Sequence, residues 1–275
     1  MVTLVDEIRE CERDTVMNVK SLRVFFFDLD GVLWVGKENP RYVGGKEIVE
    51  KLKDSGRKTF ILTNDSTHVR EEIYQNLTKL GFGFAIEDIL TSSYLTARYL
   101  TERFGKASFY LVGEDGIKRE LEAAGHYEST EPDVVVVGLD RRLSYEKLDH
   151  ALQFLRGGAS LVGSYGGAVY MSDRGPALSA GPITKALEFA SGKKAALIGK
   201  PSPRMFTLAL RLANESAGKA VMVGDQIETD LVGAGKAGVH TILVLTGVET
   251  RESLRRSKIK PEMTFDTLEA LGNLL

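Results

Sequence analysis

Cysteine is almost absent from this sequence, and histidine is sparse. Cys11 is the one cysteine among 275 residues. A single cysteine excludes an intramolecular disulfide and a zinc site built from several cysteines, and it favours a reducing, cytoplasmic location. The four histidines are scattered without an i, i+4 pair, which disfavours a histidine metal site as well. Metal sites built from cysteine or histidine are therefore not expected.

An excess of charge of one sign is also lacking. Lysine and arginine total 36 and aspartate and glutamate total 38, so the formal net charge at pH 7 is −2. A dedicated nucleic-acid binder is expected to be far more basic, and no polybasic block offers a contact for an anionic membrane. No apolar run approaches the roughly 20 residues that a bilayer span needs. Residues 1–16 are predicted to be a polar leader and not a signal peptide, because they lack a continuous apolar stretch.

What the sequence does contain is an alternation of short apolar runs with helical stretches, from residue 22 onward. The runs have the length and the β-branched or aromatic content of buried strands, and glycines often follow them. Strands that alternate with helices predict βαβ units and therefore an α/β fold with a mainly parallel sheet. The expected strands are residues 22–28, 58–63, 107–113, 133–140, 159–164, 195–199, 220–225 and 240–247.

Two aspartates end the first of these strands. Asp28 and Asp30 are separated by one residue, so both side chains are expected on the same side of the chain. Open α/β sheets bind ligands at the carboxyl ends of their strands, and Gly31 allows a sharp turn at that place. A turn with two solvated acids is the plainer alternative. Trp34 is expected to pack near the entrance of such a site.

Two further motifs follow later strands. Thr63 and Asn64 end one strand and precede a helix, where a hydroxyl and free backbone N–H groups can bind an anion. On these residues alone, ordinary N-capping by Asp65 or Ser66 is the favoured explanation. Lys200 follows another strand and can neutralise a phosphoryl oxygen or a carboxylate, although a surface lysine is common there.

The fourth motif, "GDQIETD", follows the run "AVMV". Asp225 can supply a hard oxygen ligand for Mg²⁺, which prefers carboxylates and retained waters. Asp230 stands early in the next expected helix and can hold a metal-bound water. For Asp230 alone, a favourable charge at a helix start explains the residue equally simply.

Taken together, the four motifs resemble those of the haloacid dehalogenase (HAD) superfamily. "DLDGVLW", "ILTNDST", "IGKPSPRMF" and "VMVGDQIETD" stand in the family's order, each at a strand end. The spacing is similar to that of the group with a large α/β cap after the second motif, the NagD-like or para-nitrophenyl phosphatase group. Residues 135–152 are similar to a recurrent cap segment of that group. The resemblance implies a Rossmann-like parallel-sheet core with an inserted α/β cap domain.

The resemblance also implies a reaction. Asp28 would attack phosphorus to form an aspartyl-phosphate, and Asp30 would protonate the leaving oxygen and then activate water. Mg²⁺ would be held by Asp28, the Asp30 backbone carbonyl and Asp225, with Asp230 holding a metal-bound water.

The phosphoryl oxygens would be held by Thr63, Asn64 and Lys200. The implied activity is that of a phosphatase acting on small phosphomonoesters, such as para-nitrophenyl phosphate, phosphoglycolate, glycerol or sugar phosphates, or nucleotides. A phosphotransferase or mutase using the same aspartyl-phosphate stays open, as does a protein that only binds phosphorylated ligands. A homodimer through the cap is a further expectation from the family.

Three places depart from the family pattern. Asp65 stands where a second asparagine is usual, and its charge should weaken phosphate binding unless it points away or is paired. Ser164 and Gly166 stand in the cap where asparagine and aspartate are expected, and Gln226 stands where arginine is common. Substrate preference is therefore left open. Candidate substrate contacts in the cap, which ordinary surface residues explain equally well, are Arg174, Tyr165 and Tyr170.

The expected domain division follows from the inserted cap. Residues 17–85 and 179–275 would form the catalytic core, and residues 86–178 would form the cap. Composition shows no linker at either junction, so these boundaries come from the resemblance and from the pattern of strands.

Overall fold

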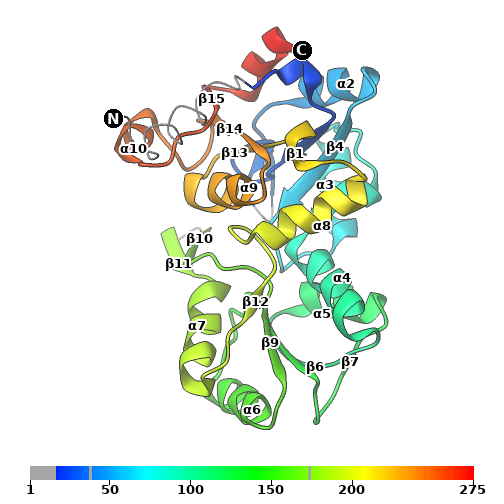
Figure 1. Ribbon diagram of the computed structural model, residues 1–275, viewed down its shortest axis with the longest axis vertical. Helices are drawn as coiled ribbons and strands as arrows, with labels where there is room; N and C mark the ends of the chain where they lie inside the picture. The colour runs from blue at the N-terminus through cyan, green and yellow to red at the C-terminus, as the bar shows by residue number, and fades with distance from the viewer. Residues whose placement is uncertain (1–16, 37–38, 173–174) are drawn as a thin grey trace, which may run out of the picture.

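The structure, a computed structural model, describes residues 17–36, 39–172 and 175–275 (Figure 1). Cys11, the polar leader and Arg174 lie outside the described residues. Within this part of the chain, the elements form two lobes, each built on a parallel sheet covered by helices. The predicted α/β fold is therefore confirmed.

The first lobe contains a six-stranded sheet in the order β15-β14-β13-β1-β4-β5. Every neighbouring pair in it is parallel. Alternate residues of β1 enter two different hydrophobic clusters: Val24 and Phe26 join one, and Phe25 and Phe27 join the other. A strand buried on both faces explains the unbroken apolar run. The strands are β1 (Val24–Phe27), β4 (Lys58–Thr63), β5 (Ile89–Thr91), β13 (Ala220–Gly224), β14 (His240–Val244) and β15 (Met263–Phe265).

Helices cover both faces of this sheet. One face packs against buried side chains of α2 and α3, and the other packs against α4, α8 and α9. A small hairpin of β2 (Trp34–Val35) and β3 (Arg41–Tyr42) follows β1. The helices of this lobe are α2 (Lys46–Asp54), α3 (Arg70–Lys79), α4 (Ser92–Phe104), α8 (Pro203–Ala213), α9 (Val232–Lys236) and α10 (Arg251–Arg256), and a π-helical turn, η4 (Ile227–Leu231), precedes α9.

The second lobe contains a five-stranded parallel sheet in the order β12-β9-β8-β6-β7. Its strands are β6 (Ser108–Val112), β7 (Tyr127–Glu128), β8 (Val134–Val137), β9 (Ser160–Gly163) and β12 (Ala196–Leu197). Its helices are α5 (Asp115–Ala123), α6 (Tyr145–Arg156) and α7 (Ala180–Ser191). A separate antiparallel hairpin joins β10 (Val169–Ser172) to β11 (Gly175–Leu178). This lobe corresponds to the predicted cap.

The predicted domain boundaries differ from the observed strand pairing. β5, at residues 89–91, pairs with β4 in the first sheet, although residues from 86 onward were expected in the cap. β12, at residues 196–197, pairs with β9 in the second sheet, although residues from 179 onward were expected in the core. Between these points, α7 packs on α6 and β9. An apolar run looks the same in either sheet, so the sequence pattern alone does not show which sheet a strand joins.

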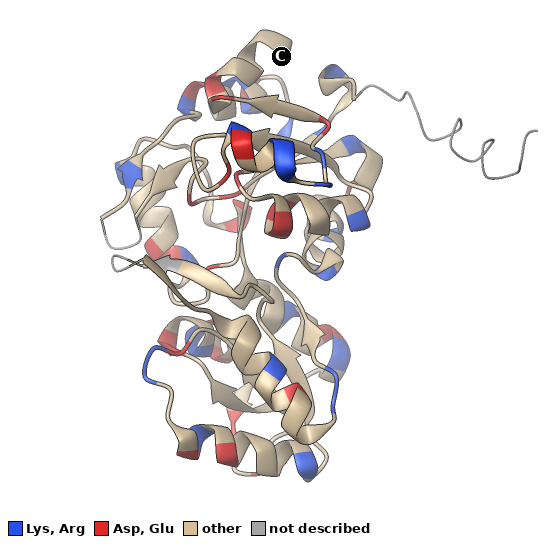
Figure 2. Cartoon of the chain, turned by 90° about the vertical axis from the view of Figure 1, so that its left-hand side faces the viewer, with Lys and Arg blue, Asp and Glu red and all other residues tan. Residues whose placement is uncertain are grey.

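Charged residues of both signs are interspersed over the two lobes (Figure 2). This distribution agrees with the nearly balanced composition of 36 basic and 38 acidic residues. No described helix is both long and apolar enough to cross a membrane.

Candidate active site

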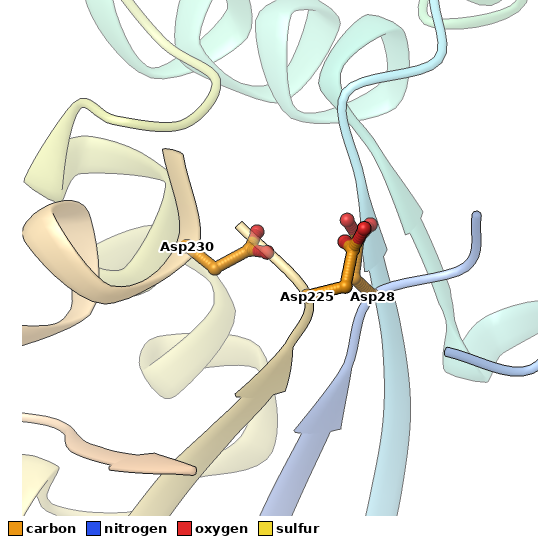
Figure 3. Close-up of side chains that lie close together, drawn as sticks. All are labelled: Asp28, Asp225 and Asp230. Carbon is orange, nitrogen blue, oxygen red and sulfur yellow. The ribbon is translucent and has the colours of Figure 1, made fainter. Parts of the chain in front are cut away.

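The carboxyl ends of two adjacent strands bring Asp28 and Asp225 together. β1 and β13 are parallel neighbours in which Phe27 pairs with Val223, and each aspartate follows within two residues. Figure 3 shows the two carboxylates side by side, with Asp230 approaching from η4. One carboxylate oxygen of each of the three aspartates lies within 4.8 Å of the others. Three acidic residues distant in sequence thus form one buried cluster.

Lys200 supplies the positive charge of this cluster. Its Nζ atom lies 2.8 Å from Oδ1 of Asp28 and 2.7 Å from Oδ1 of Asp230. The lysine side chain is only 1% exposed. Burial opposes its charge, but the two carboxylates outweigh this effect and raise the pKa of Lys200 above its ordinary value. The predicted surface alternative for Lys200 is therefore wrong.

Asp225 is held by one oxygen and leaves the other without a partner. Oδ2 accepts a hydrogen bond of 2.7 Å from the backbone N–H of Val248, whereas the buried Oδ1 has no hydrogen-bond partner. Burial, followed by the negative charges of Asp230 and Asp28, raises the pKa of Asp225 to about 8. A buried carboxylate oxygen that lacks a donor is well suited to bind a cation.

Asp230 lies within the π-helical turn η4, and its side chain reaches back to the residue that precedes the turn. Its Oδ2 accepts a hydrogen bond of 3.1 Å from the backbone N–H of Gln226, and its Oδ1 pairs with Lys200. Burial raises the pKa of Asp230 to about 6, while Lys200 acts in the opposite direction. Gln226, a departure from the family pattern, takes part here through its backbone.

The turn after β1 places Asp30 beside the cluster. Gly31 has a φ of +79°, a conformation that favours glycine. A Cβ atom at Gly31 would overlap the carboxylate of Asp225, so no side chain fits between this turn and Asp225. The side chain of Asp30 accepts a 3.2 Å hydrogen bond from the indole N–H of Trp34.

The loop after β4 joins the second motif to the third. The side-chain amide of Asn64 donates a 3.0 Å hydrogen bond to the backbone carbonyl of Lys200. Thr63 is buried, and its Oγ1 accepts a 3.2 Å hydrogen bond from the backbone N–H of Asp65. The structure therefore places Thr63 at the end of β4 and Asn64 at the start of the loop, where it contacts Lys200.

Asp65 does not stand as a free negative charge. Its Oδ1 accepts hydrogen bonds from the backbone N–H of Thr67 at 2.7 Å and from the Thr67 hydroxyl at 2.8 Å. Its Oδ2 lies 2.8 Å from Nδ1 of His68. Four contacts, including a longer one from the His68 backbone, hold the carboxylate within the loop that leads to α3. Of the two outcomes considered for this departure, pairing is the one observed.

The cap contacts the same loop directly. The Ser66 hydroxyl accepts a 3.2 Å hydrogen bond from the backbone N–H of Leu139, which follows β8. A Cβ atom at Gly116, in the first turn of α5, would overlap the backbone carbonyl of Thr67. Glu120 of α5 accepts a 3.1 Å hydrogen bond from the backbone N–H of Arg70 at the start of α3. The position of the cap is therefore coupled to the loop that carries Thr63 and Asn64.

Several contributors to the site were not predicted from the sequence. The loop after β14 supplies Val248, whose N–H holds Asp225, and Gly247, where any Cβ would overlap the Asp225 side chain. The Thr246 hydroxyl donates a 2.5 Å hydrogen bond to the Gly31 carbonyl. The sequence signal for this loop was limited to a Thr-Gly pair after an apolar run. Trp34 was expected only to pack.

Tyr165 is not an open substrate contact. It is buried, and its hydroxyl accepts a 2.6 Å hydrogen bond from the hydroxyl of Ser179. Tyr165 also lies against Gly199, where a Cβ atom would come within 2.7 Å of it. The residue therefore fixes the segment that returns from the cap to Lys200.

Comparison with known families decides what this arrangement represents. The family model described as haloacid dehalogenase-like hydrolase matches residues 25–127, and the one described as HAD-hydrolase-like matches residues 197–271. These two ranges contain all four motifs. The chain belongs to the haloacid dehalogenase-like hydrolases.

Relatives of this HAD protein match almost its whole length. A 5'-nucleotidase, YutF, from Bacillus subtilis is 31% identical over 251 residues, covering 91% of this chain and 97% of the relative. An acid sugar phosphatase from Staphylococcus aureus is 30% identical over 259 residues, covering 93% and 99%.

Solved structures of related proteins also match almost the whole chain. A 4-nitrophenylphosphatase from Thermotoga maritima is 32% identical with a TM-score of 0.87, covering 93% of this chain and 98% of that chain. NagD from Escherichia coli K-12 is 28% identical with a TM-score of 0.80, covering 90% and 97%. These matches confirm the predicted NagD-like HAD group, its core-and-cap fold and the enzyme class of phosphatase.

Proposed function

We propose that this HAD phosphatase is a Mg²⁺-dependent phosphomonoester hydrolase that acts through an aspartyl-phosphate on Asp28. The observation that carries the proposal is the position of Asp28. Its carboxylate follows β1, lies 2.8 Å from the Lys200 ammonium, and shares a buried cluster with Asp225 and Asp230. A carboxylate that pairs with a fixed cation in a water-poor site is well placed to act as a nucleophile.

The donor set fits Mg²⁺. Asp28 and Asp225 would bind the ion together with the Asp30 backbone carbonyl, and Asp230 would hold a water bound to it. The orphaned Oδ1 of Asp225 supports this assignment, because without a cation nothing on the described chain satisfies it. When bound, Mg²⁺ would supply positive charge that neutralises the phosphoryl group and the carboxylates.

In the first half-reaction, an Asp28 carboxylate oxygen attacks phosphorus while the bond from phosphorus to the ester oxygen breaks. The Asp30 carboxyl gives its proton to the departing oxygen, so the alcohol leaves neutral and Asp30 becomes a carboxylate. In the second, Asp30 takes a proton from a water that attacks the same phosphorus. Phosphate leaves, the Asp28 carboxylate is restored, and Asp30 is again protonated.

Three groups would hold the phosphoryl oxygens during both steps. The Lys200 ammonium is already directed at Asp28, and the hydrogen bond from Asn64 to the Lys200 carbonyl keeps the second motif against the third. The Thr63 hydroxyl and the Asn64 backbone N–H would complete this set. Such donors stabilise negative charge that develops in the transition state.

The proposed substrates are small phosphomonoesters. The named relatives include a 5'-nucleotidase, an acid sugar phosphatase and a 4-nitrophenylphosphatase, which supports nucleotides, sugar phosphates and aryl phosphates as first candidates. The cap lies against the phosphate-binding loop through Leu139 and Gly116, an arrangement that limits the space for a large substrate. Arg174 stays a predicted substrate contact, outside the described residues.

The proposal is tested by phosphate release from a broad panel of phosphomonoesters. Wild type and Asp28→Asn are compared, each with Mg²⁺ and with chelator, and circular dichroism checks that both are folded. We expect Mg²⁺-dependent release by wild type alone. Transfer of phosphate to an added alcohol would favour the phosphotransferase alternative, and silence across the panel would favour a binding-only protein.

A homodimer through the cap and a cytoplasmic location stay predictions. The exposed apolar side chains of the cap support the dimer: Phe189 on α7 is 93% exposed, and Val169 and Leu178 pair across the β10–β11 hairpin with 57% and 62% exposure. Light scattering should show a dimer for wild type and a monomer for Phe189→Ser.

A further inference from the structure

The turn between Asp30 and Trp34 is closed by backbone hydrogen bonds. The N–H of Gly31 donates to the Trp34 carbonyl at 2.7 Å, and the N–H of Trp34 donates to the Leu29 carbonyl at 3.2 Å. Asp30 and Trp34 form an isolated β-bridge. The two residues are therefore held at a fixed spacing by their own backbone.

Packing restrains the indole ring of Trp34. Trp34 is only 3% exposed and belongs to the hydrophobic cluster formed by Phe25, Phe27 and α2. Its strand β2 pairs with β3, where Trp34 stands opposite Tyr42. Packing thus fixes the ring, and the ring in turn fixes its N–H group.

That N–H group is directed at Asp30. The indole Nε1 lies 3.2 Å from Oδ1 of Asp30, and an indole N–H can only donate. In a carboxylic acid the carbonyl oxygen is the better acceptor, so a carboxyl that receives this bond on Oδ1 keeps its own proton on Oδ2. The contact therefore gives Oδ1 the role of acceptor.

We propose that Trp34 is a positioning residue that orients the Asp30 carboxyl so that Oδ2 delivers the proton to the leaving oxygen. This inference rests on the proposed role of Asp30 as the acid of the first half-reaction. Trp34 touches neither substrate nor metal in this account, and it acts only through Asp30. A residue assigned to packing on sequence grounds thus acquires a role in proton transfer.

A role of Trp34 in proton transfer can be distinguished from a purely structural role by comparing substrates whose leaving groups differ in basicity. An alkoxide needs a proton to depart, whereas para-nitrophenolate departs without one. Disturbing the acid therefore slows release of an alcohol far more than release of para-nitrophenol. A change that only loosens the fold slows both releases together.

The experiment measures leaving-group release under single-turnover conditions, for the best alkyl phosphate of the panel and for para-nitrophenyl phosphate. Wild type is compared with Trp34→Phe, which removes the N–H and keeps an aromatic ring, and with Asp30→Asn. Phe82→Leu is the matched control, because Phe82 is buried in the same cluster and packs against Tyr42. We expect Trp34→Phe to slow the alkyl ester about tenfold and the aryl ester about twofold or less, with Asp30→Asn showing a larger difference, on the order of 10²-fold or more.

The outcomes separate the inference from the proposed function. If Asp30→Asn slows both esters equally, Asp30 is not the acid and the proposed function fails. If Asp30→Asn discriminates between the esters but Trp34→Phe does not, the inference about Trp34 is overturned. Phe82→Leu should leave the ratio of the two rates at the wild-type value.

A second measurement does not depend on the folding of Trp34→Phe. Trp34 is the sole tryptophan of the chain, so its indole ¹⁵N–¹H group gives a single NMR signal. We expect that signal to shift in Asp30→Asn, because the acceptor of the indole N–H changes from a carboxyl to an amide group. An unchanged signal in Asp30→Asn would overturn the proposed contact.

Discussion

Lys200 and Asp230 form a fully buried ion pair with Nζ and Oδ1 2.7 Å apart, and their side chains are 1% and 0% exposed. The same ammonium also reaches Asp28. A cation shared between these two buried carboxylates holds the end of β1 and the turn η4 in one geometry. This pair therefore links the stability of the core to the arrangement of the site.

Removing the cation should be costly. In Lys200→Met, the buried carboxyl groups of Asp28 and Asp230 lose their shared cation, and we expect a loss of about 3–5 kcal/mol in the free energy of unfolding at pH 7. Urea denaturation of the metal-free variant measures it. Lys185→Met, which removes an ion pair whose lysine side chain is two-thirds exposed, is the control and should change stability by no more than about 1 kcal/mol. Equal losses in the two variants would contradict the account.

Magnesium should stabilise the protein more at high pH than at low pH. Without metal, the pKa values of Asp225 and Asp230 are raised from 3.8 to about 8 and about 6. Their contribution to metal-free stability is then fully present below about pH 4 and is lost as pH rises through 6 and 8, because the unfolded chain ionises first. Mg²⁺ binds the ionised forms and offsets this loss.

The test of this pH dependence is thermal unfolding at pH 5 and pH 8, with Mg²⁺ and with chelator. The increase in Tm caused by Mg²⁺ should be several degrees larger at pH 8. Asp225→Asn should abolish most of the difference. An increase in Tm that is the same at both pH values would show that these carboxylates do not titrate with metal binding.

Asp65 should not repel phosphate. Because its carboxylate is directed at Thr67 and His68, Asp65→Asn should change the inhibition constant of inorganic phosphate by about twofold or less. Asp65→Ala should instead lower stability by about 1–2 kcal/mol, since several backbone and side-chain donors lose their acceptor. Phosphate binding that becomes tenfold tighter in Asp65→Asn would show that the charge does face the phosphate.

The contact between the cap and the phosphate loop should control substrate binding. Gly116→Ala places a methyl group against the Thr67 carbonyl, so either α5 or the loop must shift. We expect kcat/KM to fall about tenfold with little change in secondary structure. The control is Gly83→Ala, where a Cβ atom would meet nothing within 4 Å. Wild-type kinetics in Gly116→Ala would show that the cap position does not reach the site.

Much of the fold follows from local pattern. The strand predicted at 58–63 is β4 with the same bounds, and the strand predicted at 220–225 is β13, which ends at Gly224. Parallel strands that are buried on both faces have continuous apolar sequences, which makes them easy to find. Their assignment to a sheet depends on pairing between distant segments. For this reason the strand predicted at 195–199 was assigned to the core although β12 pairs with β9, and residues 89–91 were assigned to the cap although β5 pairs with β4.

The residues of the site likewise divide into those that local sequence predicts and those that only tertiary packing reveals. Asp28, Asp30, Lys200 and Asp225 could be proposed because each follows an apolar run and together they resemble one family. The partners of these groups could not, since they depend on tertiary packing. Nothing local to Val248 shows that its N–H holds Asp225, and nothing local to Asp65 shows that Thr67 and His68 neutralise it.

Transfer of a phosphoryl group to Asp28 is detected by mass spectrometry of acid-quenched protein. Asp30→Asn is mixed with para-nitrophenyl phosphate and Mg²⁺, because loss of the base slows hydrolysis of the intermediate while the aryl group still departs. We expect a burst of para-nitrophenol equal to the enzyme concentration and one added phosphoryl group on the peptide that contains Asp28. Turnover without phosphorylation of that peptide, or a phosphoryl group on another residue, would contradict this expectation.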